Sequence, residues 1–355
     1  MRAARVGLSV LLAFFTAAGC TYILDLEGTK KGEHGAGAGG SGSTSSGGGT
    51  GGSGAHGGGG AGAGCAVPCE PEPVAEGQTA PESLILDGVN AYWIAGEGAA
   101  RGVRRLQLGS ASPEPMIEGE PNLVQIVQCD DRVCGTSKVG TTTALRRSNN
   151  DGNAMEALLA PPGCDATRIA SDTQNLYWID AANRRFSRLL LNETPFEEIV
   201  IEDFFTEGNS LRDVVVRSNG VYLAVDNEVR LYPLAGGMPT TVYPTTGTTP
   251  SRIAVDGNDI CWIDTTDGNV KCHGSPLSIS TTTGLAAIAI DSSRVFWAEA
   301  NEIHRMNVAG TGRLTIARGQ QTPSSIAVSS GWVYWTNNRQ GGGEIMRVKA
   351  DCGCE

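Results

Sequence analysis

The stretch Ile253-Ala254-Val255-Asp256, followed closely by Cys261-Trp262-Ile263-Asp264, decides the fold of this chain. An apolar run that ends in Asp comes first, a short turn follows, and a second run carries Trp. The same unit recurs along the chain, and five of the six tryptophans occupy the same place in it: Trp93, Trp178, Trp262, Trp297 and Trp335. The sequence is therefore built from repeats.

Two weaker copies of the unit fill the gaps between the tryptophans. Cys134 and Leu223 take the place of Trp in these copies, which gives seven aligned positions separated by 35 to 45 residues. Repeats of this length, made of short strands and turns, are typical of a β-propeller, in which each repeat forms one four-stranded sheet around a central axis. We therefore predict an all-β propeller with seven four-stranded blades, with six or eight blades as the alternatives.

Within one repeat, β-branched and aromatic residues form short runs that Gly, Asn, Asp and Pro separate. In the repeat around Trp262 we expect four strands, at Arg252–Asp256, Ile260–Asp264, Asn269–His273 and Leu277–Thr281.

The last repeat lacks an outer strand of its own after Glu344–Lys349. At the other end of the domain, Val74–Pro81 aligns without a gap on Ile316–Pro323, at the same offset of 242 residues that relates Trp93 to Trp335. We therefore expect the N-terminal segment to pair with Glu344–Lys349 and to close the ring by strand exchange.

Four cysteines flank the two strands that would close the ring. Cys65 and Cys69 precede the first strand, and Cys352 and Cys354 follow the last one, so closure brings both pairs to one hairpin end. Two disulfides could join them, and the sequence does not choose between the two pairings. A zinc cluster is the alternative, but it needs thiolates, which an oxidising compartment tends to consume.

The remaining cysteines of the domain suggest local pairs. Cys261 and Cys272 lie on neighbouring strands of one repeat, and Cys129 and Cys134 flank a four-residue turn, so each pair is a disulfide candidate. Cys164 is left over, either as a free buried thiol or as a sign that the local pairing differs.

The N-terminus has the features of a secretory signal peptide. Arg2 and Arg5 precede an apolar stretch, and Ala17-Ala18-Gly19 stands directly before Cys20. A cysteine after such a site resembles the lipobox of bacterial lipoproteins, which implies that residues 1–19 are removed and that Cys20 is acylated; ordinary cleavage is the alternative. Because Thr21 is not Asp, the resemblance also implies passage to the outer membrane, facing the periplasm or the cell surface.

The following segments hold the propeller away from the lipid. We assign residues 20–34 to the anchored segment, 35–64 to a disordered Gly/Ser-rich tether and 65–355 to the propeller domain. The formal charge of −11 disfavours nucleic acid and anionic lipid headgroups as partners, so contact with the bilayer is expected through the acyl anchor alone.

Tyr177-Trp178-Ile179-Asp180 and Cys261-Trp262-Ile263-Asp264 resemble the YWTD repeat of lipoprotein-receptor propellers. The resemblance covers Pro73 to Asp351 and implies the propeller fold. It also implies that Asp180 and Asp264 have structural roles. It implies no particular ligand.

Recognition is expected on the loops that join the second and third strands and that join successive sheets, because these loops differ most between repeats. The expected partner is a protein, peptide or glycan, and the propeller is expected to be a monomer. Three arginines could contact an acidic partner and two phenylalanines could form an apolar anchor. The candidates are Glu97, Arg101, Arg184, Arg185, Phe204, Phe205, Asn337, Asn338 and Arg339.

The sequence favours a non-catalytic role over the alternative of a metal-dependent hydrolase or lactonase. Aspartates recur at the end of the inner strands (Asp87, Asp172, Asp256 and Asp291), but Gln128, Arg217 and Ser329 occupy the same place in other repeats. A catalytic site breaks the symmetry of repeats, whereas a structural hydrogen bond recurs with them. We predict no catalytic residue, metal ligand or cofactor, with an incidental cation in the channel as an intermediate case.

Overall fold

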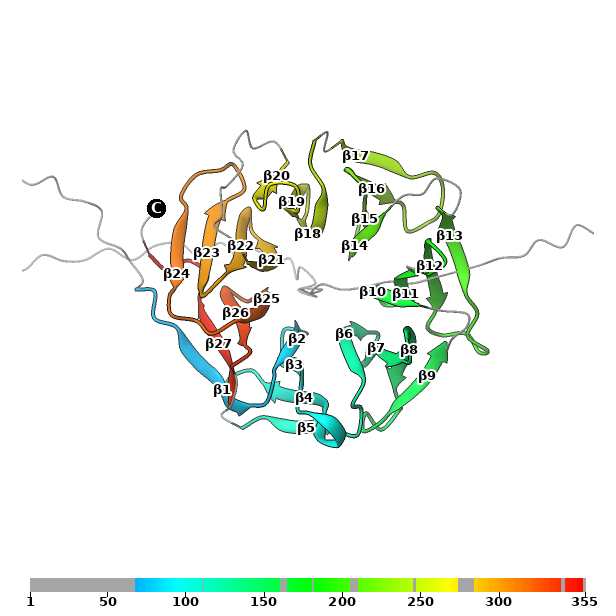
Figure 1. The fold of residues 1–355 in the computed structure, drawn as a ribbon, viewed down its shortest axis with the longest axis horizontal. Coiled ribbons are helices and arrows are strands. Elements are labelled where there is room, and N and C mark those ends of the chain that lie inside the picture. The colour runs from blue at the N-terminus through cyan, green and yellow to red at the C-terminus, as the bar shows by residue number, and fades with distance from the viewer. Residues whose placement is uncertain are drawn as a thin grey trace, which may run out of the picture.

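The computed structural model describes residues 68–110, 112–159, 165–180, 182–204, 210–244, 247–273, 284–339 and 342–353. In these ranges the chain forms seven antiparallel sheets arranged around a central axis (Figure 1). The prediction of a seven-bladed, all-β propeller is confirmed. The signal peptide, Cys20, the tether, Cys65, Cys164 and Cys354 lie outside the described residues, so the sequence-based expectations for them stay predictions.

Blades 1 to 6 are built from strands that follow one another along the chain, from the axis outward, whereas blade 7 takes its outer strand from the N-terminal end of the domain. Blades 1 to 3 contain β2 (Glu82–Leu86), β3 (Asn90–Ala95), β4 (Gly102–Gln107) and β5 (Glu114–Ile117); β6 (Leu123–Cys129), β7 (Arg132–Val139), β8 (Thr142–Ser148) and β9 (Met155–Leu159); and β10 (Ala166–Ser171), β11 (Asn175–Asp180), β12 (Arg185–Leu190) and β13 (Ile199–Asp203). The one described helical turn, η1 (Gly98–Ala100), lies between β3 and β4.

Blades 4 to 7 continue the ring. They contain β14 (Leu211–Arg217), β15 (Gly220–Val225), β16 (Glu228–Tyr232) and β17 (Thr240–Pro244); β18 (Pro250–Asp256), β19 (Asp259–Asp264) and β20 (Val270–Cys272); β21 (Leu285–Asp291), β22 (Arg294–Glu299), β23 (Glu302–Asn307) and β24 (Leu314–Ala317); and β25 (Pro323–Ser329), β26 (Trp332–Asn337), β27 (Gly343–Lys349) and β1 (Glu72–Gln78). The outer strand expected at 277–281 in blade 5 lies outside the described residues, and His273 follows β20 instead of lying on it.

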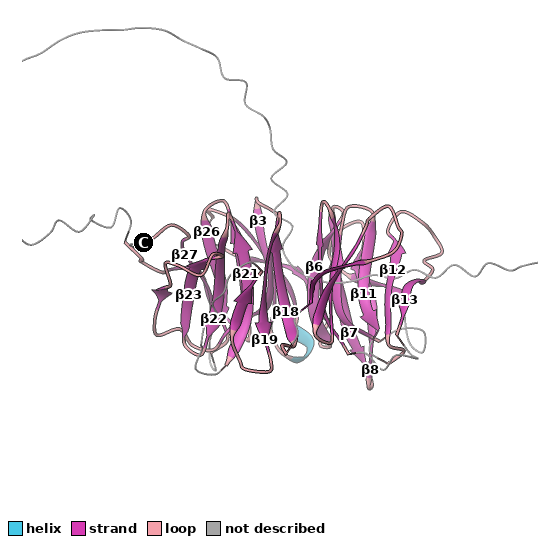
Figure 2. Cartoon of the chain, turned by 90° about the horizontal axis from the view of Figure 1, so that it is seen from above, coloured by secondary structure: helices cyan, strands magenta, loops and turns pink. Residues whose placement is uncertain are grey.

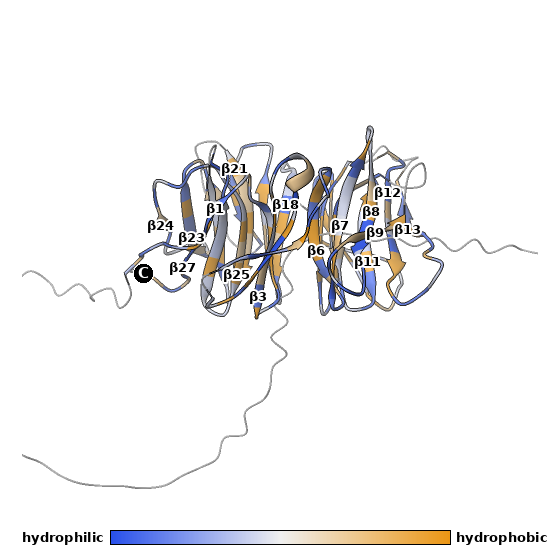
Figure 3. Ribbon diagram, turned by 90° about the horizontal axis from the view of Figure 1, so that it is seen from below, coloured by the Kyte–Doolittle hydropathy of each residue, from blue (hydrophilic) through white to orange (hydrophobic). Residues whose placement is uncertain are grey.

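The repeated tryptophans fill the spaces between blades. Trp93 packs in one cluster with Ala327 and Tyr334 of blade 7, and Trp335 packs with Phe296 and other residues of blade 6. The five repeated indoles are at most 2% exposed. Burying a side chain of this size stabilises the folded state by about 3 kcal/mol or more, so the period of the sequence is the period of the blade interfaces. Figure 3 shows apolar residues along the strands and polar residues on many of the loops.

The N-terminal strand closes the ring. β1 pairs antiparallel with β27, with Glu72 opposite Arg347 and Gln78 opposite Gly343, and the two strands lie side by side in Figure 1. A disulfide between Cys69 and Cys352 holds the same ends together. The strand exchange expected from the sequence is therefore present.

Blade 2 differs from the sequence alignment by one residue. β6 and β7 pair with Ile126 opposite Gly135, so Gly135 and not Cys134 stands where the other blades have Trp. A Cβ at Gly135 would lie 2.8 Å from the carbonyl oxygen of Gln125 and 3.0 Å from carbons of Leu123 and Met155, so these three residues leave no room for an indole. The same register puts Cys129, not Gln128, at the end of the inner strand.

Disulfides join the two local cysteine pairs. Cys261 and Cys272 are direct partners across β19 and β20, and Cys129 and Cys134 lie on either side of the β6–β7 turn.

Candidate functional site

The strands run across the disc from one face to the other, so the connecting loops gather at its two faces (Figure 2). The loops between second and third strands, and those that lead from one blade to the next, share one face, because every blade is a simple up-and-down meander. We call this face the loop face.

A groove of about 460 Å³ lies on the loop face between blades 1 and 2. It is lined by Glu82, Gly96, Glu97, Gly98, Arg101, Pro121, Asn122, Leu123, Val124 and Lys138. Glu82 and Val124 also line the central channel, so the groove opens into the channel mouth.

The wall of the groove on blade 1 is formed by a tight loop between β3 and β4. Gly96 has φ +96°, and a Cβ at this position would lie 2.3 Å from the carbonyl oxygen of Ala100, so only glycine fits there. The turn η1 follows directly and leaves the Glu97 side chain exposed.

Arg101 fixes this loop to blade 2. Its Nε donates a hydrogen bond of 2.9 Å to the carbonyl oxygen of Leu123, and its guanidinium forms an ion pair with Glu82. Burial lowers the pKa of Arg101, which nevertheless stays charged at neutral pH. Arg101, predicted as a contact residue, thus holds the groove in shape.

Charges of opposite sign face solvent from the two blades that form the groove. Glu97 on blade 1 and Lys138 on blade 2 are both exposed. Pro121 and Val124 line the same groove, and Val124 is 40% exposed, which is unusual for a valine on an inner strand. Acidic, basic and apolar groups in one groove suit a polypeptide segment that carries charges of both signs.

The predicted arginines of other blades lie outside this groove. Arg184 is exposed, Arg185 pairs with Asp203 at 3.3 Å, and Arg339 lies 3.9 Å from Glu344. None of them lines the groove or the channel, so the structure does not bring the predicted set together.

Two predicted contact residues are buried. Phe204 is fully buried in the core beside blade 4, where the guanidinium of Arg230 lies 5.3 Å from the centre of its ring. Asn337 is 4% exposed and donates a hydrogen bond of 3.0 Å to Gln320 Oε1. The prediction that either faces a partner is wrong, because each completes the packing or hydrogen bonding where one blade meets the next.

The last two candidates are Phe205 and Asn338. Phe205 lies outside the described residues. Asn338 is half-buried, and its backbone N–H donates to the carbonyl oxygen of Thr322 at 3.2 Å.

Two of the four recurrent aspartates hold the turn after their inner strand. Asp87 accepts hydrogen bonds from the backbone N–H groups of Val89 and Asn90 and from the Tyr92 hydroxyl at 2.8 Å, and Asp172 makes the same set of bonds in blade 3. Asp256 and Asp291 instead accept from the backbone N–H and the hydroxyl of Ser292, respectively, each at 2.9 Å. Burial alone would raise the pKa of Asp87, but the bonds from Asn90, Val89 and Tyr92 outweigh it and lower the pKa. In the described ranges, no three His, Cys, Asp or Glu side chains gather as a metal site would require.

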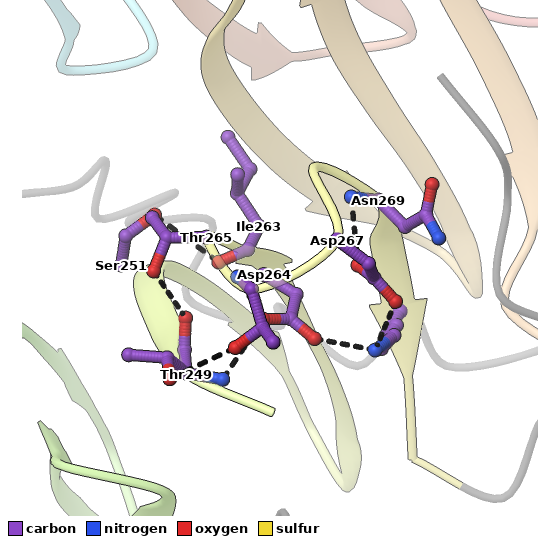
Figure 4. A network of polar contacts seen from close by, with 9 residues as sticks. Thr249, Ser251, Ile263, Asp264, Thr265, Asp267 and Asn269 are labelled. Carbon is purple, nitrogen blue, oxygen red and sulfur yellow. Dashed lines mark hydrogen bonds and ion pairs between the residues drawn. The ribbon is translucent and has the colours of Figure 1, made fainter. Parts of the chain in front are cut away.

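The second repeated aspartate braces the loops of its blade. Asp264 is fully buried and accepts hydrogen bonds of 2.8 Å from the backbone N–H groups of Thr249 and Thr266 (Figure 4). Its second oxygen pairs with Lys271. Asp180 similarly accepts two bonds from Asn183. Both carboxylates thus hold loop residues in place.

The central channel contains a cavity of about 230 Å³. One position of the inner strand contributes to the lining in all seven blades, three residues before the last strand residue in blades 1 and 3 and four before it in the others: Ser83, Gln125, Arg168, Asp213, Arg252, Ala287 and Ser325. The sequence pointed to the aspartates at the strand ends and not to this position. Aligning the repeats column by column would have shown it, whereas Lys138 and Val124 carry no signal in the sequence.

Comparison with known proteins supports the fold. No protein-family model matches the chain, and no curated protein matches it. Among solved structures, it is similar to virginiamycin B lyase from Staphylococcus aureus, with a TM-score of 0.59 and 13% identity over 79% of this chain and 99% of that one. It is also similar to YCF48 from Cyanidioschyzon merolae, with a TM-score of 0.56 and 11% identity over 79% and 98%.

BamB from Moraxella catarrhalis is a third similar structure, with a TM-score of 0.50 and 10% identity over 78% of this chain and 97% of that one. At such low identity these similarities show the propeller fold alone. Among the described residues, no helix has the length and hydrophobicity that crossing a membrane requires.

Proposed function

We propose that this protein is a non-catalytic binding module that holds an extended polypeptide segment of a partner protein in the loop-face groove between blades 1 and 2. The groove itself supports this proposal most directly, because Glu97, Lys138 and the exposed Val124 all belong to its lining. Arg101 and Gly96 keep its wall rigid, which lowers the entropic cost of binding.

A peptide suits the groove better than a glycan does. Aromatic rings commonly form the platforms on which sugar rings stack, and the described lining residues include no aromatic side chain. The lining instead offers the exposed carboxylate of Glu97, the ammonium group of Lys138 and the apolar carbons of Pro121 and Val124, which match the mixed chemistry of a polypeptide.

We further propose that the module is anchored in the bacterial outer membrane through acylated Cys20 and carried on the tether of residues 35–64. The signal-like N-terminus and the glycine-rich composition of that segment support this arrangement. A metal-dependent hydrolase remains the alternative, supported by the general use of propellers in enzymes, of which the lyase named above is one example.

Selection of displayed peptides against the full-length chain tests the proposal. Peptides bound in the groove are expected to carry both charge signs and to lose about tenfold or more in affinity to Glu97→Lys and to Lys138→Glu. Arg339→Glu, which reverses an exposed charge elsewhere, serves as the matched control. Peptides whose binding ignores both groove variants would contradict the proposal.

A further inference from the structure

Each of the seven blades contributes the residue at one equivalent position of its inner strand to the lining of the central channel, but these seven residues differ in chemistry. Four of them are neutral: Ser83, Gln125, Ala287 and Ser325. The three charged ones, Arg168, Asp213 and Arg252, lie on consecutive blades, 3, 4 and 5. A property that breaks the symmetry of repeats calls for an explanation other than the repeating architecture.

Part of the explanation is structural. The Ser325 hydroxyl accepts a hydrogen bond of 3.1 Å from the Leu84 N–H of the next blade, and Ser83 does the same for Ile126 at 2.9 Å. Asp213 performs this role between blades 4 and 5, where its Oδ2 accepts from the Ile253 N–H at 2.9 Å. A serine hydroxyl therefore suffices for this hydrogen bond between blades, and the charge of Asp213 is not needed for it.

The charge of Asp213 instead acts on the arginines beside it. Its Oδ1 lies 3.7 Å from Nε of Arg168, and Arg252 adds a favourable charge from blade 5. Burial nevertheless raises the pKa of Asp213, because the loss of hydration disfavours the charged carboxylate more than the two arginines favour it. The fourth charged residue of the lining, Glu82, is paired with Arg101 in the groove wall.

Arg168 is thus paired with Asp213, whereas Arg252 acts on Asp213 only through its charge, and both arginines line a cavity of about 230 Å³, which has room for a ligand of several non-hydrogen atoms. The guanidinium group is planar and binds carboxylates through two parallel hydrogen bonds. A second carboxylate in the channel would balance the second arginine.

We propose that the central channel binds a small organic carboxylate between Arg168 and Arg252. In the unliganded channel the carboxylate of Asp213 balances the charge of Arg168 and therefore competes with a bound carboxylate. This site is separate from the proposed peptide groove, although the groove opens into the same channel mouth through Glu82 and Val124.

Titration calorimetry of the full-length chain with acetate and with succinate tests the site, and inorganic phosphate serves as the comparison anion. We expect saturable binding of a carboxylate, weakened about tenfold or more by Arg252→Gln and less by Arg252→Lys, which keeps the charge without the planar fork. Asp213→Asn keeps a side-chain oxygen for the hydrogen bond from the Ile253 N–H and removes the competing charge, so it is expected to tighten carboxylate binding.

Arg339→Gln, outside the channel, is the matched control and is expected to bind as the wild type does. The melting temperature of each variant shows whether it is folded. Absence of saturable carboxylate binding to the wild type, or equal affinity in folded Arg252→Gln, would overturn the proposal. Phosphate binding that is stronger than carboxylate binding would also overturn it, because it would show a general anion site.

Discussion

The indole N–H of Trp93 donates a hydrogen bond of 3.1 Å to Oε1 of Gln78. Gln78 belongs to β1, the outer strand of blade 7, whereas Trp93 lies on the second strand of blade 1. Trp335 makes the equivalent bond to Gln320 at 2.9 Å, at the offset of 242 residues that relates the two repeats in the sequence. The N-terminal strand therefore takes the place that β24 has in the preceding blade.

Gln78→Ala is expected to destabilise the domain by about 1–3 kcal/mol, because it leaves the indole N–H of Trp93 buried without a partner. Urea denaturation measures the change in the free energy of unfolding. Gln107→Ala, at an exposed position of β4, is the control and is expected to change it by less than about 0.5 kcal/mol. Equal effects of the two substitutions would contradict the proposed strand equivalence.

The cysteines that close the ring are expected to contribute more stability than the local pairs. Replacing Cys65, Cys69, Cys352 and Cys354 together by Ser removes a cross-link between residues 283 positions apart and should cost about 5 kcal/mol on the chain-entropy model. Replacing Cys129 and Cys134, only five positions apart, should cost about 2 kcal/mol on the same model. Chemical denaturation under oxidising conditions compares them, and a larger loss for the local pair would show that strand pairing alone holds the ring closed.

Asp264→Asn is expected to lower stability by about 3 kcal/mol at neutral pH, because Lys271 loses its buried ionic partner and the loop N–H groups lose a charged acceptor. Burial would raise the pKa of Asp264, but Lys271 and the backbone donors Thr249 and Thr266 lower it overall. The stabilisation is therefore present above the ordinary carboxyl pKa of about 4 and is lost as the pH falls through the lowered value.

Denaturation curves between neutral and strongly acidic pH measure this dependence. The difference in stability between the wild type and Asp264→Asn should shrink as the pH falls below about 4. Glu97→Gln, at an exposed carboxylate without a cap bond, is the control and should leave the curve nearly unchanged. A difference that stays constant with pH would mean that the charge of Asp264 is not what stabilises the loop.

Much of the fold could be predicted because the same stabilising contacts between blades recur along the chain. Trp178 and Trp262 pack at interfaces that recur once per blade, so their spacing in the sequence indicates the number and size of the blades. The segment around Gln78 could be placed because its sequence resembles that of the segment around Gln320. The register of blade 2 could not be predicted, since the exchange of Trp for Gly135 depends on how Leu123 and Met155 pack over it.

The candidate site was less predictable than the fold. Phe204 and Asn337 stand in variable connections, which suggested exposure, yet their side chains turn into the blade interfaces. Arg101 meets Leu123 of the next blade only after folding. Contacts between neighbouring repeats depend on loop shape, and no periodic feature of the sequence records that shape.

Photocrosslinking in cells tests directly whether a partner protein binds in the loop-face groove. A photoreactive amino acid is placed at Asn122, an exposed residue of the groove lining, in the full-length chain, and separately at Met238, which is 85% exposed and lies in a loop between β16 and β17, outside the groove. We expect one discrete crosslinked protein from position 122, joined through a segment with charges of both signs and lost on Glu97→Lys. Identical products from both positions, or products that persist in Glu97→Lys, would contradict it.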